Sequence, residues 1–302
     1  SPRQQAIMKK TSTIGWLGTG VMGEPMAGHL LEAGHSLVVH TRTRKKADFL
    51  IARGAEWGET PRELAQKSDF IFTMLGYPRD VEEIYCSEDG VLAGCQSDSV
   101  LIDMTTSSPE LAKRIARKAL ERDADAIDAP VSGGDVGAKS GKLAIMCGGK
   151  KSAFEKVLPL LKLMGDKIEL FGSSGAGQRV KMSNQILIAS TMVGTVESLL
   201  YAERSKLDLM QVIGLIGQGA AGCWSINQLG PRMAKEDWAP GFFVKHFVKD
   251  MGIALEDAGR MGLKLEGLEL ARDFYERVKD AGFADKGTQV LLHVLRTMNE
   301  AG

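Results

Sequence analysis

The chain of 302 residues has no excess of charge of either sign, because 38 Lys and Arg residues balance 38 Asp and Glu residues. Proteins that bind the phosphate backbone of nucleic acids usually carry a basic excess, so we expect no nucleic-acid partner. The apolar content of 44% and the charged content of 25% are ordinary for a globular protein. A chain of this length has room for one large domain or two ordinary ones.

Cysteine is scarce, and the few cysteines form no recognisable motif. Cys86, Cys95, Cys147 and Cys223 include no CxxC pair, and none of the five histidines lies at zinc-ligand spacing from them. This pattern is typical of reduced thiols in a cytosolic-type protein. We therefore expect no metal site.

The N-terminal segment SPRQQAIMKKTST lacks the apolar core of a secretory signal. Met8, followed by Lys9 and Lys10, is a candidate natural start, which makes residues 1–7 a candidate cloning remnant. We expect a cytoplasmic protein, or an organellar one if a transit peptide has been removed.

One apolar stretch, residues 180–201, is long enough to be mistaken for a membrane span. It contains Lys181, Asn184, Gln185 and Glu197, which are costly to place in lipid. We therefore expect a helix buried between domains or subunits, and no membrane partner.

The first half of the chain alternates short apolar runs with amphipathic stretches. Such alternation predicts a parallel sheet with helices on both faces. The Ala33-Gly34 pair is a natural helix end. The expected strands are 13–17, 36–40, 70–75, 100–104, 126–129 and 143–147, and helices are expected at 21–32 and 45–53 with further helical stretches between the later strands.

The pattern changes near residues 172–177, which read GSSGAG. From Gln178 onward the apolar periodicity is helical, with breaks at 217–222 and 239–241 and no strand-like alternation. We expect an α/β domain over residues 1–174 and an all-α domain over residues 175–302, entered through one long helix.

The first predicted strand runs directly into GTGVMG, residues 18–23. A GxGxxG pattern between a strand and a helix, inside a βαβ unit, is the fingerprint of a dinucleotide site. Gly18 permits the tight turn, Gly20 lets the backbone approach a pyrophosphate, and Gly23 lets the helix pack on the strand. The free N–H groups of the helix N-terminus bind the phosphates. The sequence therefore predicts a Rossmann-type domain, with an ordinary glycine-rich turn as the alternative.

The end of the second strand bears on the choice of cofactor. NAD-binding domains of this type place an acidic residue there, but residues 40–47 contain none and Asp48 is the first. A 2′-phosphate would instead meet the guanidinium of Arg42 and the hydroxyl of Thr43. We expect NADP, with NAD possible, and a solvated basic turn is the alternative interpretation.

Ser132, Gly133 and Gly134 follow another predicted strand. In open α/β sheets, ligands lie at the carboxyl ends of the strands. A hydroxyl and two unshielded glycine amides suit a carboxylate, although a capped turn explains the same residues. The surrounding PVSGG is not the GxSxG of a hydrolase nucleophile.

Lys181 and Asn184 are three residues apart, so they share a face of the long helix. A buried lysine is rare unless it is paired or functional. Dehydrogenation needs a group that exchanges the hydroxyl proton, which a lysine can do while an asparagine orients it or binds substrate. A lysine that extends to solvent from the helix start is the alternative.

Five segments together resemble the β-hydroxyacid dehydrogenase family over nearly the whole chain: IGWLGTGVMG, IDMTTSSP, DAPVSGGDVGAKSGKLAIMCGG, GAGQRVKMSNQ and FFVKHFVKDMGIAL. The resemblance is nearest to 3-hydroxyisobutyrate dehydrogenase-like proteins, with glyoxylate/succinic semialdehyde reductases and tartronate semialdehyde reductases as relatives. It implies a nicotinamide-dependent enzyme that interconverts a small β-hydroxy acid with its semialdehyde or keto acid.

The resemblance also implies the site residues. Lys181 is the implied acid/base, with Asn184 as its companion, and the Lys249–Asp250 pair closes over the nicotinamide from the second domain. The implied cofactor contacts are Gly18, Gly20, Val21, Met22, Gly23, Arg42, Thr43, Lys46, Met74, Leu75, Thr106 and Lys249. The implied substrate contacts are Ser132, Gly133, Gly134, Lys181, Asn184, Phe242 and Asp250, with Lys181, Asn184 and Ser132 as the catalytic set.

Two departures from the family pattern are mild. Thr41 stands where relatives have asparagine in Asn-Arg-Thr, and Thr105 stands where many have serine in Ser-Thr.

Among the alternatives to this family, 6-phosphogluconate dehydrogenase has a far larger helical domain. Imine reductases lack the lysine, as do non-catalytic cofactor-binding modules. The expected partners are a small carboxylate-bearing substrate and further copies of the chain, in a homodimer or homotetramer through the helical domains.

Overall fold

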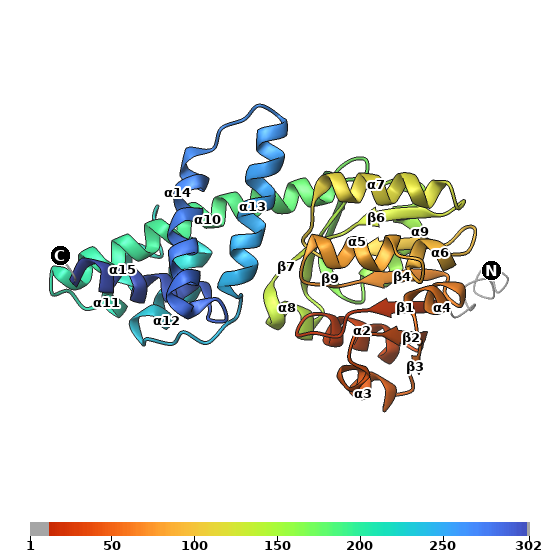
Figure 1. Ribbon diagram of the computed structural model, residues 1–302. Coiled ribbons are helices and arrows are strands. Elements are labelled where there is room, and N and C mark those ends of the chain that lie inside the picture. The colour runs from red at the N-terminus through yellow and green to blue at the C-terminus, as the bar shows by residue number, and fades with distance from the viewer. Residues whose placement is uncertain (1–11, 301–302) are drawn as a thin grey trace, which may run out of the picture. The chain divides into compact units, whose positions relative to one another are not determined.

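The computed structural model describes residues 12–300 (Figure 1). It divides into two units, of which the first ends at Lys181. The division falls inside α10 (Ala176–Arg204), a helix that begins shortly after the expected domain boundary at residues 174–175. The candidate start at Met8 and the candidate remnant at residues 1–7 lie outside the described residues.

The first unit contains a parallel six-stranded sheet in the order β3-β2-β1-β4-β5-β6. The order reverses between β1 and β4, and such a switch point is where ligands bind in open α/β sheets. The strands read as apolar runs because both faces of the sheet are covered. They are β1 (Thr13–Leu17), β2 (Ser36–His40), β3 (Glu56–Trp57), β4 (Phe70–Thr73), β5 (Val100–Asp103) and β6 (Asp125–Asp128).

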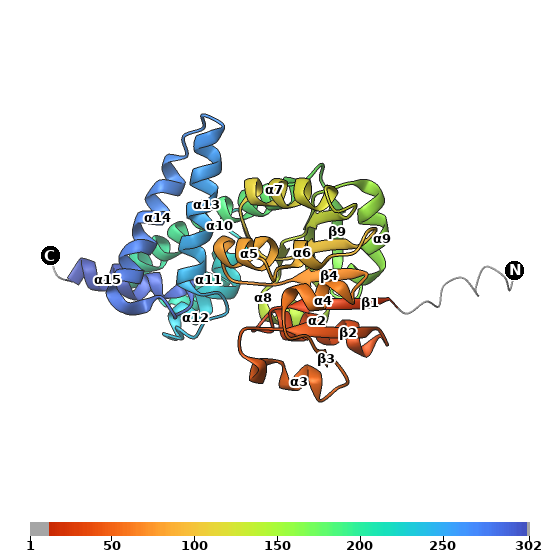
Figure 2. The same cartoon turned by 45° about the vertical axis from the view of Figure 1, so that its right-hand side comes forward.

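Successive side chains of a strand point to opposite faces of the sheet, so they pack into two different hydrophobic cores. In β5, Ile102 packs into one core and Leu101 into the other. The first core is covered by α2 (Gly23–Glu32), α3 (Asp48–Ile51), α8 (Gly134–Ser140) and α9 (Lys151–Leu161). The second is covered by α4 (Pro61–Gln66), α5 (Pro78–Cys86), α6 (Val91–Gly94) and α7 (Pro109–Leu120), as Figure 2 shows for α5 and α7.

One expected strand does not join this sheet. β8 (Leu143–Cys147) pairs antiparallel with β7 (Val131–Ser132) and parallel with β9 (Gly165–Leu170), so the prediction that it continues the parallel sheet is wrong. Only residues 133–142 connect β7 to β8, and parallel neighbours need a crossover of roughly a dozen residues or more. Among the described residues, one isolated bridge, Asp128 to Gly148, links the two sheets.

Helix boundaries also differ from the pattern in two places. The expected helix 21–32 begins at Gly23, because Val21 and Met22 belong to the turn of the glycine loop. The expected helix 45–53 is a 3₁₀ turn, η1 (Arg44–Ala47), followed by the short α3.

The second unit is helical, as expected, and its described residues form no strand beyond an isolated bridge between Phe243 and Gly287. The breaks at 217–222 and 239–241 fall between helices. Its elements after α10 are α11 (Leu209–Ile216), the π-turn η2 (Ser225–Leu229), α12 (Gly230–Ala234), α13 (Val244–Arg260), α14 (Glu266–Val278), the π-turn η3 (Lys279–Phe283), the 3₁₀ turn η4 (Thr288–Val290) and α15 (Leu291–Glu300).

Within residues 12–300, α10 is the one helix whose length and composition would allow it to cross a membrane. Its apolar residues Ala189, Met192, Val196 and Leu199 are fully buried in the core of the helical unit. One face of α10 therefore belongs to the core of the helical unit.

Candidate active site

The glycine loop after β1 has the geometry that the motif predicts. Gly18 has φ +98°, and a Cβ there would collide with the carbonyl oxygen of Met74. A Cβ at Gly23 would collide with the carbonyl oxygen of Gly18, so the helix packs tightly on the turn. Gly20 has no atom within 4 Å of the position of a Cβ, which leaves its backbone open to a pyrophosphate. Exposed Val21 follows it.

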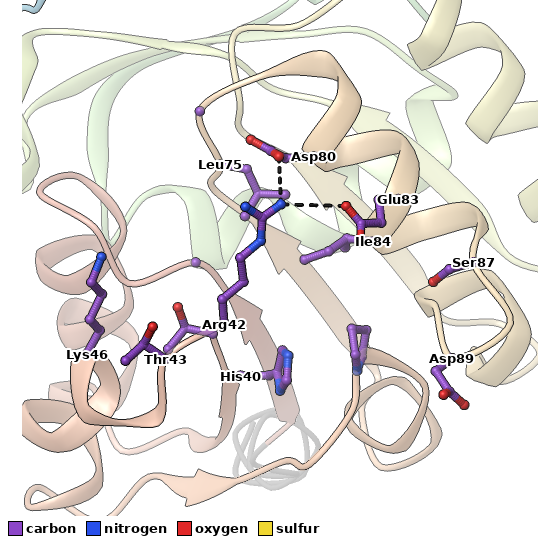
Figure 3. Close-up of a pocket in the computed structure, with 14 residues that line it drawn as sticks. His40, Arg42, Thr43, Lys46, Leu75, Asp80, Glu83, Ile84, Ser87 and Asp89 are labelled. Carbon is purple, nitrogen blue, oxygen red and sulfur yellow. Dashed lines mark hydrogen bonds and ion pairs between the residues drawn. The ribbon is translucent and has the colours of Figure 1, made fainter.

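A cavity of about 350 Å³ lies beside this loop, between the end of β2 and α5 (Figure 3). It brings together five of the predicted cofactor residues, namely Gly18, Arg42, Thr43, Lys46 and Leu75. Its lining does not include Gly20, Val21, Met22, Gly23, Met74 or Thr106. The sequence pattern does not point to the other lining residues, which are His40, Thr41, Pro61, Gly76, Asp80, Glu83, Ile84, Ser87 and Asp89.

Two of the missed residues change the interpretation of Arg42. Its guanidinium lies 2.7 Å from the carboxylate of Asp80 and 3.6 Å from that of Glu83, both on α5 (Figure 3). The cavity therefore carries acids as well as the basic turn that the sequence predicts. An exposed ion pair of this kind is weak, about 0–1 kcal/mol, so a phosphate can compete for Arg42.

A buried polar network surrounds Asp103 at the end of β5. The carboxylate of Asp103 accepts hydrogen bonds from the Thr73 hydroxyl (2.8 Å) and from the Thr105 amide (3.1 Å). Burial raises the pKa of Asp103 to about 6, partly offset by these bonds, and burial also raises the pKa of Asp128 to about 6.

These raised pKa values predict a pH dependence of stability. A carboxyl whose pKa rises on folding stabilises the protein below its ordinary pKa of 3.8, and that contribution is lost as the pH rises through about 6. Between pH 4 and 6 we expect the free energy of unfolding of the parent to fall relative to that of Asp103→Asn, by up to about 3 kcal/mol. Urea unfolding across this range measures the difference. Exposed Asp166 provides the control substitution, Asp166→Asn, and parallel curves for parent and Asp103→Asn would contradict the prediction.

The predicted carboxylate site follows β7. Gly133 (φ +130°) and Gly134 (φ +63°) adopt left-handed conformations that favour glycine, and both are exposed. Gly134 has no atom within 4 Å of the position of a Cβ, and half-buried Ser132 precedes the pair. The arrangement leaves backbone N–H groups and one hydroxyl available to an anion.

Lys181 lies in the second turn of α10, and only 8% of its surface is exposed. A buried ammonium is the kind of group that acid/base chemistry uses.

In the helical unit, Gln185 links three of the remaining predicted site residues, Asn184, Lys249 and Asp250. The Asn184 amide donates to the side chain of Gln185, which donates in turn to Asp250, each at 2.8 Å. Asp250 also pairs with Lys249 at 2.9 Å. In the sequence, Gln185 is a polar residue within the long apolar stretch at 180–201, and this is the signal that points to it. Phe242 is outside this chain of bonds and contacts the ring of Phe247.

Two family models match almost the whole described chain. Residues 13–172 match the NAD binding domain of 6-phosphogluconate dehydrogenase, and residues 175–295 match the NAD-binding domain of NADP-dependent 3-hydroxyisobutyrate dehydrogenase. The chain belongs to the β-hydroxyacid dehydrogenase family. It is therefore an NAD(P)-dependent oxidoreductase that acts on CH–OH groups.

Relatives within this family include a probable mitochondrial 3-hydroxyisobutyrate dehydrogenase-like protein of Arabidopsis thaliana, 48% identical over 97% of this chain and 88% of that protein. The 2-hydroxy-3-oxopropionate reductase of Escherichia coli is 36% identical over 94% of this chain and 97% of that protein. A solved structure of 3-hydroxyisobutyrate dehydrogenase from Mycobacterium tuberculosis with L-serine has a TM-score of 0.87 and 30% identity, over 95% of this chain and 99% of that one.

Proposed function

We propose that this dehydrogenase interconverts a short β-hydroxy acid and its semialdehyde or keto acid, with NADP as the preferred cofactor and Lys181 as the acid/base. The observation that carries the proposal is the buried lysine on α10, in the same structural unit as the glycine loop and the Ser132–Gly134 turn. The names of the relatives support the substrate class, because 3-hydroxyisobutyrate, 2-hydroxy-3-oxopropionate and L-serine are all small carboxylates.

The residues present fit a nicotinamide dinucleotide, since open Gly20 and the cavity beside Gly18 provide room for it. The bound nicotinamide supplies or accepts the hydride. Ser132 and the amides that follow it hold the substrate carboxylate. In the reducing direction, the Lys181 ammonium donates a proton to the carbonyl oxygen, and in the oxidising direction the neutral amine accepts the hydroxyl proton. Asn184 orients the reacting oxygen.

A steady-state panel tests this function. Glyoxylate, succinic semialdehyde, methylmalonate semialdehyde and tartronate semialdehyde, with the matching hydroxy acids, are assayed with NADPH/NADP and NADH/NAD. A phosphorylated sugar acid as the best substrate would contradict the proposed substrate class.

For the cofactor, we expect Arg42→Ala to raise the KM for NADPH much more than the KM for NADH. Charge-assisted hydrogen bonds to one phosphate contribute about 1.5–3 kcal/mol, or roughly one to two decades. The ion pairs of Arg42 with Asp80 and Glu83 compete with the phosphate, which points to the lower end of that range. For the same reason, Asp80→Asn should favour NADPH further.

The matched control for Arg42 is Arg44→Ala. The Arg44 guanidinium lies over the ring of Trp57, 5.6 Å from its centroid, and is not part of the cavity lining. Equal KM values for NADPH and NADH in the parent enzyme would contradict the proposed preference.

A homodimer or homotetramer through the helical unit is part of the same proposal. Leu187 and Tyr201 on α10 and Leu215 on α11 are each more than 60% exposed, and apolar side chains exposed this far are common at subunit contacts. Light scattering after size-exclusion chromatography measures the molecular mass, and a monomer at micromolar concentration would contradict the assembly.

A further inference from the structure

Two buried side chains that have no role in the proposed reaction hold the start of α10. The carboxylate of Asp128, at the end of β6, accepts hydrogen bonds from the backbone amides of Gly175 (2.8 Å) and Gln178 (2.9 Å). These amides are among the groups that a helix N-terminus leaves without partners inside the helix. Asp128 therefore caps α10 from a strand some fifty residues earlier in the chain.

Gln178 holds the same turn to the loop after β5. Its side chain is fully buried and uses both ends of the amide. The oxygen accepts from the Ser107 amide at 2.9 Å, and the nitrogen donates to the Thr105 carbonyl at 2.8 Å. With both amide atoms occupied, the side chain has one orientation, and the loop that contains Thr106 is tied to the helix.

Close backbone packing adds a steric restraint. A Cβ at Gly177 would lie 2.7 Å from the carbonyl oxygen of Asp128 and would collide with that of Met146. The first turn of α10 thus packs directly against the strand ends, and it has no room to shift toward them.

The network reaches the cofactor cavity as well. The Thr105 hydroxyl accepts a hydrogen bond from the amide of Leu75 at 2.8 Å, and Leu75 lines the cavity. A single set of buried bonds therefore joins the cavity, the loop after β5 and the start of α10.

We propose that Gln178 and Asp128 are positioning residues, which fix Lys181 relative to the loop at residues 105–107 and so to the reacting atoms. This inference rests on the proposed acid/base role of Lys181. Lys181 follows Gln178 by three residues, so the two side chains lie on one face of the same helix, less than one turn apart. A tilt or slip at Gln178 is transmitted directly to the ammonium.

The test replaces Gln178 with methionine, which is similar in length but makes neither hydrogen bond. A misplacement of about 1 Å can cost on the order of a hundredfold in rate, so we expect kcat to fall by about tenfold to a hundredfold. The KM for substrate should change by less than about threefold, because the carboxylate turn is not altered. The Kd for NADPH should change less than kcat, because Gln178 itself does not line the cavity and reaches it only through Thr105.

The solvent isotope effect on kcat separates positioning from simple loss of folded enzyme. A misplaced proton donor makes proton transfer more rate-limiting, so the effect in D₂O should increase in Gln178→Met. A smaller folded fraction lowers kcat and leaves the isotope effect unchanged. Asp128→Asn keeps the size of the side chain but loses one hydrogen-bond acceptor. It should likewise show a lower kcat and a larger isotope effect, and it replaces Gln178→Met in the test if that variant does not fold.

Thr191→Val is the matched control, because it removes a hydrogen bond from α10 to Ser225 (2.7 Å) further along the same helix. It should keep the parental kcat and isotope effect. A parental kcat in Gln178→Met, or a lower kcat with an unchanged isotope effect, would overturn the positioning role. Lys181→Met is assayed beside it: if that variant keeps its kcat, the acid/base proposal itself fails, whereas an inactive Lys181→Met with a parental Gln178→Met overturns only the positioning.

Discussion

The Lys181→Ala variant is expected to lose turnover by about a hundredfold to ten-thousandfold, the range typical of general acid–base catalysis. The expected loss lies in kcat, because the lysine acts on the reacting oxygen and the cofactor cavity does not include it. NADPH binding, measured by fluorescence titration, should remain nearly unchanged.

Two further measurements sharpen this prediction. A small primary amine added to Lys181→Ala should restore part of the activity, because it can occupy the vacated space and transfer the proton. Exposed Lys156 on α9 provides a matched control, and Lys156→Ala should keep the parental kcat. A near-parental kcat in Lys181→Ala on the best substrate would show that the acid/base role belongs to another group.

The second large effect concerns the substrate carboxylate. Methyl-ester or amide analogues of the best substrate are expected to lose kcat/KM by several decades. Donors that bind an anion are left without partners by a neutral analogue, and a site built on such donors rejects it by about four to five decades. The donors in question are the amides and the hydroxyl of the Ser132–Gly134 turn, which a bound substrate would cover and shield from water.

The analogue series is measured in the reducing direction with saturating NADPH. Ser132→Ala should weaken discrimination between acid and ester, because it removes one of the donors while the glycine amides remain. An ester that reacts as fast as its acid would show that the carboxylate binds elsewhere or does not bind at all.

The sequence determined the features that depend on local backbone chemistry. Gly18 and Gly23 predicted the turn because backbone atoms lie where their side chains would be. β5 was predictable because a strand covered on both faces is mostly apolar, as Val100–Ile102 are. Lys181 stood out for a similar reason, since a charge is conspicuous on an apolar helix. In each case one short segment contains the whole signal.

Tertiary structure alone decided which distant segments meet. Asp80 and Glu83 look like the solvated face of a helix, and only the fold places them against Arg42, 38 residues away from Asp80 in sequence. The same holds for β8, whose apolar pattern suits either sheet and whose place follows from the short connection to β7. Asp128 and Gln178 are bound to partners 47 to 73 residues away, through hydrogen bonds that have no periodicity along the chain. Local propensity and patterning are properties of a segment, whereas these contacts depend on how the strand ends are brought together, and that is settled only when the sheet assembles.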